Sequence, residues 1–273
     1  MKIISALFIL LALITSASAQ QIASERGTNI LPETGDWGVM FDATPFLDYG
    51  GNILNGSNQS SVSPSFPNGY LNTLVIKKLM TGERAVRIKL RIGLSSDGAD
   101  SIVPFLGGTS PLPTVTDSRT VSSHNITVGI GTQKSFGKGR TRGYIGKEIL
   151  MSFSGRDTTY KYGGGPLTQS NWMHTNTFGQ ERGVTEIKQG SIFSLNLHFV
   201  MGVEYFFASK MSLSAEYSWG LGYFTGSDGK ISKEVWNFQT GKIKTDTEKI
   251  PGSHSFKVDN ANNAGSINLT LYF

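Results

Sequence analysis

The sequence predicts an all-β fold, an eight-stranded antiparallel up-and-down β-barrel, and three observations lead to this prediction. First, about eight segments alternate apolar and polar residues or have the length and composition of a strand. Second, the connections between these segments are alternately short and long. Third, no apolar run after the N-terminal region approaches the roughly 18 residues of a membrane helix, so any membrane span has to be built from strands.

The N-terminal region is typical of a secretory signal peptide. Lys2 is followed by an apolar run from Ile3 to Ile14 and by the small residues Ser16 to Ala19. We therefore expect cleavage after Ala19, with residues 1–19 as signal peptide, 20–35 as a polar, mobile periplasmic segment and 36–273 as the barrel. The chain contains no cysteine, which excludes a lipid-anchored lipoprotein, disulfides and thiolate chemistry.

The alternation that defines the strands is clearest in residues 86–94, which follow the tight turn predicted at 80–84. One face of this segment is apolar and consists of Val86, Ile88, Leu90, Ile92 and Leu94. The opposite face carries the cations Arg87, Lys89 and Arg91. Because side chains alternate faces along a strand, this segment has one apolar side and one cationic side.

The remaining strands follow the same pattern, although the face of the second one cannot be assigned. They are predicted near 37–47, 71–79, 124–134, 144–154, 192–207, 211–223 and 266–273. Tight turns are expected at 80–84, 137–141 and 208–210, and long loops at 49–70, 97–121, 155–190 and 225–260.

Three features favour a membrane barrel over a soluble one. Several alternating runs reach the roughly 9–11 residues that a transmembrane strand needs. Aromatic residues lie near the ends of the apolar faces, as in interfacial girdles (Trp37, Phe193, Tyr205, Phe207, Trp219, Tyr223). The charged residues, only 16% of the chain, are interspersed with small residues on the polar faces. We therefore expect a transmembrane β-barrel in a bacterial outer membrane, with long extracellular loops, short periplasmic turns and both termini periplasmic.

In a barrel of this size the interior is just wide enough for side chains, so the charges on the polar faces are expected to pair inside the lumen. The predicted charge network comprises Asp42, Arg87, Lys89, Arg91, Glu148, Glu204 and Glu216. The alternative is that these residues form a solvated surface. Lys147 falls on the apolar face of its strand, and we expect it to snorkel toward a headgroup region.

Several segments resemble a known family. Residues 71–79 with the strand 85–94, the stretch Gly143-Tyr144-Ile145-Gly146-Lys147-Glu148 and the closing Leu269-Thr270-Leu271-Tyr272-Phe273 are similar to those of Bacteroidota outer-membrane β-barrel proteins, which are related in architecture to the small OmpX and OmpA barrels. The resemblance covers nearly the whole mature chain. It implies the barrel fold and export through the barrel-insertion machinery, whose recognition signal the terminal aromatic resembles, and it specifies no activity.

No motif indicates catalysis, a metal or a cofactor. The histidines His124, His174, His198 and His254 are too scattered for metal-ligand spacing, and no P-loop or nucleophile elbow occurs. The tetrad 227–230 matches S-x-x-K, but its Asp-Gly pair is typical of a turn. The net charge is +5, yet the basic residues lie beside turns or along one strand without an aromatic-interleaved patch, which excludes nucleic-acid binding.

The predicted loops carry the remaining functional potential. Aromatic residues occur where polar ones would suffice (Tyr160, Tyr162, Trp172, Phe178, Trp236, Phe238), and they either anchor a partner or pack on one another. The leading hypothesis is a non-enzymatic structural or docking barrel that presents its loops to a surface protein, a glycan or lipopolysaccharide. Outer-membrane lipids are its expected surroundings. The alternatives are a lipid-modifying enzyme that uses His174 or His254, and a small pore.

Overall fold

The computed structural model describes residues 29–43, 74–105, 113–258 and 265–273, and these ranges form a single antiparallel sheet of eleven strands. The expected signal peptide, most of segment 20–35 and the loop predicted at 49–70 lie outside the described residues. The strands are β1 (Trp37–Asp42), β2 (Leu74–Thr81), β3 (Arg84–Pro104), β4 (Thr114–Phe136), β5 (Thr141–Lys161), β6 (Val184–Ala208), β7 (Met211–Gly226), β8 (Gly229–Asn237), β9 (Lys242–Ile250), β10 (His254–Val258) and β11 (Gly265–Tyr272).

Eight of these strands close into a hydrogen-bonded ring. Strands β1 to β6 pair with one another in chain order. The ring closes because β6 also pairs with β7, β7 pairs with β11, and β11 pairs with β1. The ring is therefore β7-β11-β1-β2-β3-β4-β5-β6, and no strand in it has a free edge along its paired length. The all-β, antiparallel prediction with eight ring strands is confirmed.

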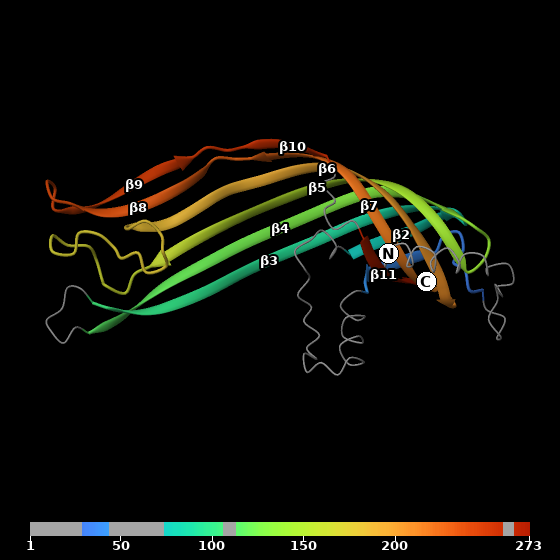
Figure 1. The fold of residues 1–273 in the computed structure, drawn as a ribbon, viewed down its shortest axis with the longest axis horizontal. Helices are drawn as coiled ribbons and strands as arrows, with labels where there is room; N and C mark the ends of the chain where they lie inside the picture. The colour runs from blue at the N-terminus through green and yellow to red at the C-terminus, as the bar shows by residue number, and fades with distance from the viewer. Residues whose placement is uncertain (1–28, 44–73, 106–112, 259–264) are drawn as a thin grey trace, which may run out of the picture.

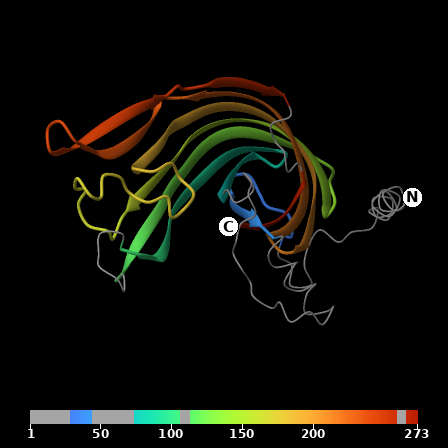
Figure 2. The same ribbon diagram turned by 60° about the vertical axis from the view of Figure 1, so that its left-hand side comes forward.

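Strands β3 to β6 continue far beyond the ring. They are 21 to 25 residues long, whereas β1, β2 and β11 have at most eight. Past the end of β7, strand β8 takes its place beside β6, and β9 pairs with β8. Figures 1 and 2 show the result, a closed ring at one end that opens into a long, curved sheet. We call the part formed by residues 93–105, 113–125, 155–190 and β8–β9 the outer sheet.

The outer sheet corrects the prediction of long loops. Within the predicted loops 97–121 and 225–260, the described residues are largely strand, with β8, β9 and β10 all inside the second of them. The predicted loop 155–190 is strand only at its two ends, where β5 extends to Lys161 and β6 begins at Val184. The segments Asp97–Pro104 and Thr114–Val121 pair with one another residue by residue. These segments have no apolar face, so the alternation used to recognise strands is missing, although Val, Ile and Thr give them high β-propensity.

The ring is inverted relative to a soluble domain. Its outward side chains are mainly apolar, and Ile92, Ile130, Ile145 and Met201 are each more than half exposed. The inward side chains are polar and buried, among them Lys77, Arg87, Glu148, Glu204 and Thr270. In water this arrangement would expose large apolar surface and bury ions, and both are costly.

One end of the ring is filled by an apolar cluster. Ile30, Leu79, Ala85, Phe206 and Tyr272 pack together, and Ile30 is only 2% exposed. The segment that carries Ile30 is tied to the β6–β7 turn, since the Lys210 amide donates to the Ile30 carbonyl over 2.9 Å. Residues 29–31, expected to belong to a mobile periplasmic segment, therefore pack against the end of the ring.

Candidate functional site

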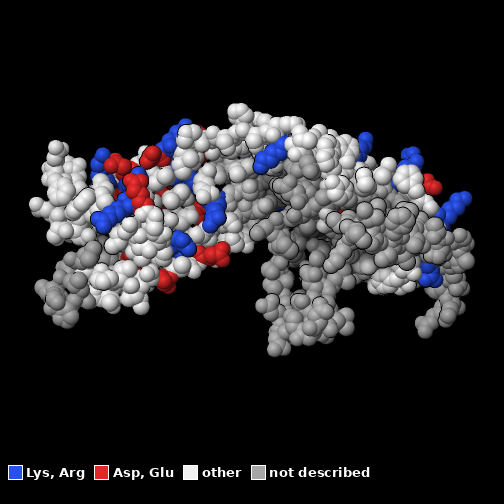
Figure 3. Space-filling model, in the orientation of Figure 1, with Lys and Arg blue, Asp and Glu red and all other residues white. Residues whose placement is uncertain are grey.

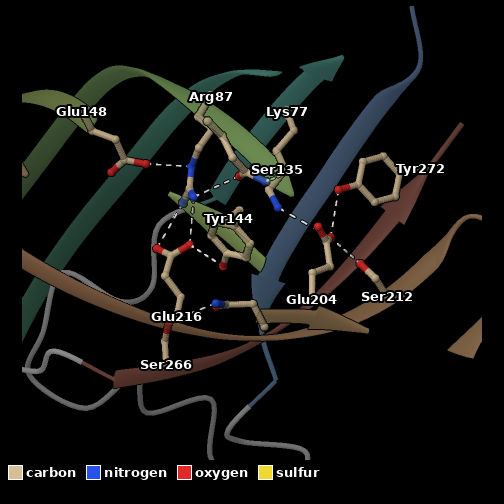
Figure 4. A network of polar contacts seen from close by, with 12 residues as sticks. Lys77, Arg87, Ser135, Tyr144, Glu148, Glu204, Ser212, Glu216, Ser266 and Tyr272 are labelled. Atoms are coloured by element: carbon tan, nitrogen blue, oxygen red, sulfur yellow. Dashed lines mark hydrogen bonds and ion pairs between the residues drawn. The ribbon is translucent and has the colours of Figure 1, made fainter. Parts of the chain in front are cut away.

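Arg87 lies at the centre of the ring interior and joins strands that are far apart in the sequence (Figure 4). Its Nε is 2.7 Å from Oε1 of Glu148 on β5, and its Nη1 is 2.8 Å from Oε2 of Glu216 on β7. Nη1 also donates to Oε1 of Gln133 at 3.2 Å. Lys89 approaches the other oxygen of Glu148 at 2.5 Å. Two carboxylates thus neutralise two cations across the interior of the ring.

A second set of polar contacts surrounds Glu204, nearer the apolar cluster. Glu204 Oε1 accepts hydrogen bonds from Ser212 at 2.6 Å and from the Tyr272 hydroxyl at 2.9 Å. The ammonium of Lys77 lies 3.7 Å from the same oxygen. Tyr144 stands between the two sets, because its hydroxyl donates to Glu216 at 3.0 Å and its ring lies under Lys77. The buried charges therefore form one connected network.

Two glycines provide the space that the network needs. Gly131 is the register partner of both Arg87 and Glu148, so it lies between the two ions that pair across it. Gly202 is likewise the partner of both Tyr144 and Glu216, and a Cβ at Gly202 would come within 2.5 Å of the Tyr144 hydroxyl. Long side chains cross the interior because the strands between them carry no side chain at these positions.

The structure brings together five of the seven residues predicted for the charge network. Arg87, Lys89, Glu148 and Glu216 are in direct contact, and Glu204 belongs to the neighbouring set. Arg91 is on the same face of β3, two residues beyond Lys89, and is half-buried. Asp42 ends β1, and its side chain lies outside the described part of the structure.

Sequence reasoning missed Lys77, Gln133, Tyr144 and Tyr272 as members of the network. Lys77 stands beside Lys78, and two adjacent lysines give no indication of which one faces inward. Tyr144 and Tyr272 fall on polar faces in the alternation, and that position could have identified them, because a phenol buried among carboxylates can donate a hydrogen bond.

The described part of loop 155–190 that is not strand, residues 162–183, folds back onto the outer sheet. Asp117 of β4, 1% exposed, accepts hydrogen bonds from the Gly163 amide at 2.9 Å and from the Thr175 hydroxyl at 2.7 Å, and Thr177 donates to the same carboxylate. Figure 1 shows this loop in yellow at the end of the sheet remote from the ring. One buried carboxylate thus holds three points of the loop.

Three of the six aromatic residues predicted to contact a partner hold this loop in place instead. Phe178 packs on Tyr160 with ring centroids 6.2 Å apart, and the Arg119 guanidinium lies over Phe178. The Tyr162 hydroxyl donates to the Val184 carbonyl, and its ring stacks on His174 with centroids 4.2 Å apart. These contacts follow the alternative interpretation, in which the loop aromatics pack within the protein.

The other three aromatic residues lie together at the tip of the outer sheet. The Trp236 amide donates to the Trp172 carbonyl, and Ile243 is the register partner of Trp236. Phe238 lies two residues after Trp236, directly after the end of β8. Trp172, Phe238 and Ile243 are 46%, 61% and 44% exposed, respectively. We call Trp172, Trp236, Phe238 and Ile243 the tip patch.

Burial shifts the pKa of two groups beside the loop. It raises the pKa of Tyr162 to about 12, which keeps the hydroxyl protonated as a donor. It also lowers the pKa of His174, although the Glu234 carboxylate lies 3.6 Å from the imidazole Nε2 and acts in the opposite direction. His174 is therefore a neutral ring stacked on Tyr162 near pH 7.

Comparisons with known proteins give no family assignment. No family model matches the chain, and no curated protein matches it significantly. In the described ranges, no cluster of three or more histidine, aspartate or glutamate residues could hold a metal ion. Those same ranges contain no helix long and apolar enough to cross a bilayer.

Proposed function

We propose that the protein is an integral outer-membrane β-barrel that holds the outer sheet above the membrane as a docking surface, without catalytic activity. The observation that carries the proposal is the inverted ring, with isoleucine, phenylalanine and methionine outside and ion pairs inside. A bilayer removes the cost of the apolar exterior, and ring closure satisfies the backbone hydrogen bonds that hydrocarbon would leave unpaired.

The distribution of charge supports the same orientation. Charged side chains of both signs gather over the outer sheet at the left of Figure 3, and few lie over the middle of the visible face. The short turns lie at the other end of the ring, together with Phe273. In the proposed orientation this end faces the periplasm, and the outer sheet projects from the cell.

The packing of the interior favours a closed barrel over a pore. Arg87 and Lys77 are 0% exposed, and Tyr144 is 2% exposed. Water therefore does not reach these side chains, although they lie in the middle of the ring. A conducting lumen would need a continuous path of water past this level.

The tip patch is the candidate docking surface, and its chemistry favours a protein partner. Exposed tryptophan, phenylalanine and isoleucine bordered by charges of both signs resemble a protein interface, which has an apolar, aromatic-rich centre and a polar rim. The neighbouring charges include Lys242 and Lys244 on β9. An edge strand with so many charges resists nonspecific strand addition, so specificity resides in the tip patch.

Membrane insertion is tested first. The purified protein is expected to require detergent and to migrate faster on a gel before boiling than after it, as closed outer-membrane barrels do. A chain that remains in the aqueous periplasmic extract would contradict the proposal.

Docking is tested by photo-crosslinking in intact cells. A photoreactive residue at Phe238 is expected to capture a discrete protein, and the matched position Ile102, 74% exposed on β3, is expected to capture none. Substituting Trp172→Ala should weaken the product at Phe238. Capture of lipopolysaccharide instead would replace the protein partner by a glycolipid, and equal capture at both positions would remove the docking role.

A further inference from the structure

The outer wall of the ring carries an apolar groove near the turn end. Its volume is about 880 Å³, which is in the range of ligand-binding clefts, and its lining residues lie on strands β2 to β6. The outward side chains along it include Met80, Ile145, Phe199 and Met201, all at least 45% exposed. Such a groove suits an acyl chain.

Three cations border this groove, and they are the feature that an ordinary lipid-facing wall lacks. Arg84, Lys134 and Lys147 line it and are exposed. Arg84 and Lys134 are direct register partners, so their Cβ atoms lie about 4.5–5.5 Å apart. Lys147 is paired with Thr132, one outward position further from the turn. All three positive charges thus gather on neighbouring strands.

No carboxylate in the described part of the structure pairs with the three cations, since its ion pairs include none of them. The ammonium of Lys134 lies over the Phe136 ring, 5.3 Å from its centroid. Glu148, which follows Lys147, points inward to Arg87. Directly opposed like charges destabilise a sheet unless an anion lies between them.

We propose that this groove binds an anionic glycerophospholipid of the periplasmic leaflet, with its phosphate among Arg84, Lys134 and Lys147 and an acyl chain along the apolar wall. The inference rests on the proposed membrane insertion, which places the turn end at the periplasmic headgroups. Lys147 lies about two residues, or about 7 Å, deeper along the strand than Lys134. Its flexible stem reaches back to the phosphate and keeps its charge out of the hydrocarbon.

Native mass spectrometry of the detergent-solubilised full chain tests this site with two lipids that have identical acyl chains. Dioleoylphosphatidylglycerol is expected to be retained over dioleoylphosphatidylcholine, because only the former has a net negative charge. The triple variant Arg84→Gln, Lys134→Gln, Lys147→Gln should lose that preference, by about fivefold for each cation removed. The triple variant Lys242→Gln, Lys244→Gln, Lys249→Gln on β9 controls for total charge and should keep it.

Two failures are distinguishable. A folded protein with the heat-dependent gel shift that retains both lipids equally, or a groove variant that retains phosphatidylglycerol as well as the parent, would overturn the lipid site and leave the barrel standing. A chain soluble without detergent would overturn the proposed function and the lipid site together. The groove variant is expected to keep the heat-dependent gel shift, because its three glutamines replace exposed charges on the outer wall only. That shift serves as the control that its barrel has formed.

Discussion

The ring and the outer sheet share strands β3 to β6 but differ in which side chains these strands expose. In the ring, β3 to β6 place apolar residues outside and charges inside, so that Ile130 is 62% exposed while Glu148 is 2% exposed. In the outer sheet the same strands carry serine, threonine and charged residues on both faces, and every residue of β9 from Lys242 to Lys249 is exposed. The change takes place within single strands, without a break in pairing between β3 and β4.

This difference shows that backbone pairing sets the fold while the surroundings decide which faces are apolar. The outer sheet is not independent of the ring, because its strands continue from the ring and a loop folds onto it, so it can carry polar residues on both faces. The ring has an exposed apolar outer face and a buried polar interior, and we propose that lipid covers the apolar face. The two regions should therefore respond differently to the same substitution.

The largest expected difference comes from charge removal. Arg87→Met leaves Glu148 and Glu216 without their main counter-ion, and removing one partner of a buried pair costs about 3–5 kcal/mol. We expect a large loss of stability against urea in vesicles, measured by the folded fraction on a gel. Lys244→Met removes a lysine that pairs with Asp246 at the surface and should cost about 1 kcal/mol or less. Equal losses of stability in Arg87→Met and Lys244→Met would contradict the claim that charges are buried in the ring and solvated in the outer sheet.

The next effect concerns the apolar exterior. Ile130→Arg places a charge in the apolar belt of the ring, which we propose to face lipid, and should reduce stability by about 2–4 kcal/mol near the midplane. Ile102→Arg changes a residue that is 74% exposed in the outer sheet and should shift stability by about 0.5 kcal/mol or less. The same unfolding measurement compares them. Tolerance of arginine at Ile130 would mean that water contacts the belt.

A smaller effect is expected from filling the space beside the network. Gly202→Ala brings a methyl group against the Tyr144 hydroxyl and should cost about 1–3 kcal/mol by overpacking. Gly98 in the outer sheet has no atom within 4 Å of a Cβ, so Gly98→Ala is the matched control and should be neutral or slightly stabilising. A neutral Gly202→Ala would show that Tyr144 does not cross to Glu216.

The smallest effect is the pH dependence of the loop at 162–183. Burial lowers the pKa of His174 below its usual 6.5, where it faces Tyr162, Glu234 and Asp117. A neutral buried histidine stabilises the attached loop above pH 6.5, and this contribution is lost as the pH falls through the lowered pKa. The protection factors of the loop amides, which correct for the pH dependence of intrinsic exchange, should therefore fall below pH 6.5, by at most about tenfold per pH unit. In His174→Phe this fall should disappear, and protection that is equally acid-sensitive in this variant would exclude His174 as its cause.

The ring could be predicted from the sequence because its exposed apolar outer face and its narrow polar interior require opposite chemistry at alternate residues. Val86 to Leu94 and Phe193 to Phe207 carry this pattern over their whole length. The charges Arg87, Glu148 and Glu216 could be named for the same reason, since inward ions in a narrow ring have to meet one another.

The outer sheet and part of the network could not be predicted in this way. Asp97 and Thr120 belong to strand segments with polar residues on both faces. In such segments no alternation of apolar and polar residues distinguishes a strand from a loop. The three partners of Asp117 lie 46 to 60 residues away in the chain, and only the folded loop brings them together. Lys77 and Lys78 are chemically identical, and the choice between them follows from the register of β2 with β1 and β3.

Spin labelling tests the central claim most directly, namely that the outer face of the ring contacts acyl chains. The chain contains no cysteine, so Ile130→Cys and Ile102→Cys each give a single labelled site in reconstituted vesicles. The label at Ile130 is expected to collide with dissolved oxygen and to be shielded from a water-soluble nickel chelate, while the label at Ile102 collides with the chelate. A label at Ile130 that is as accessible to the nickel chelate as the one at Ile102 would contradict the account.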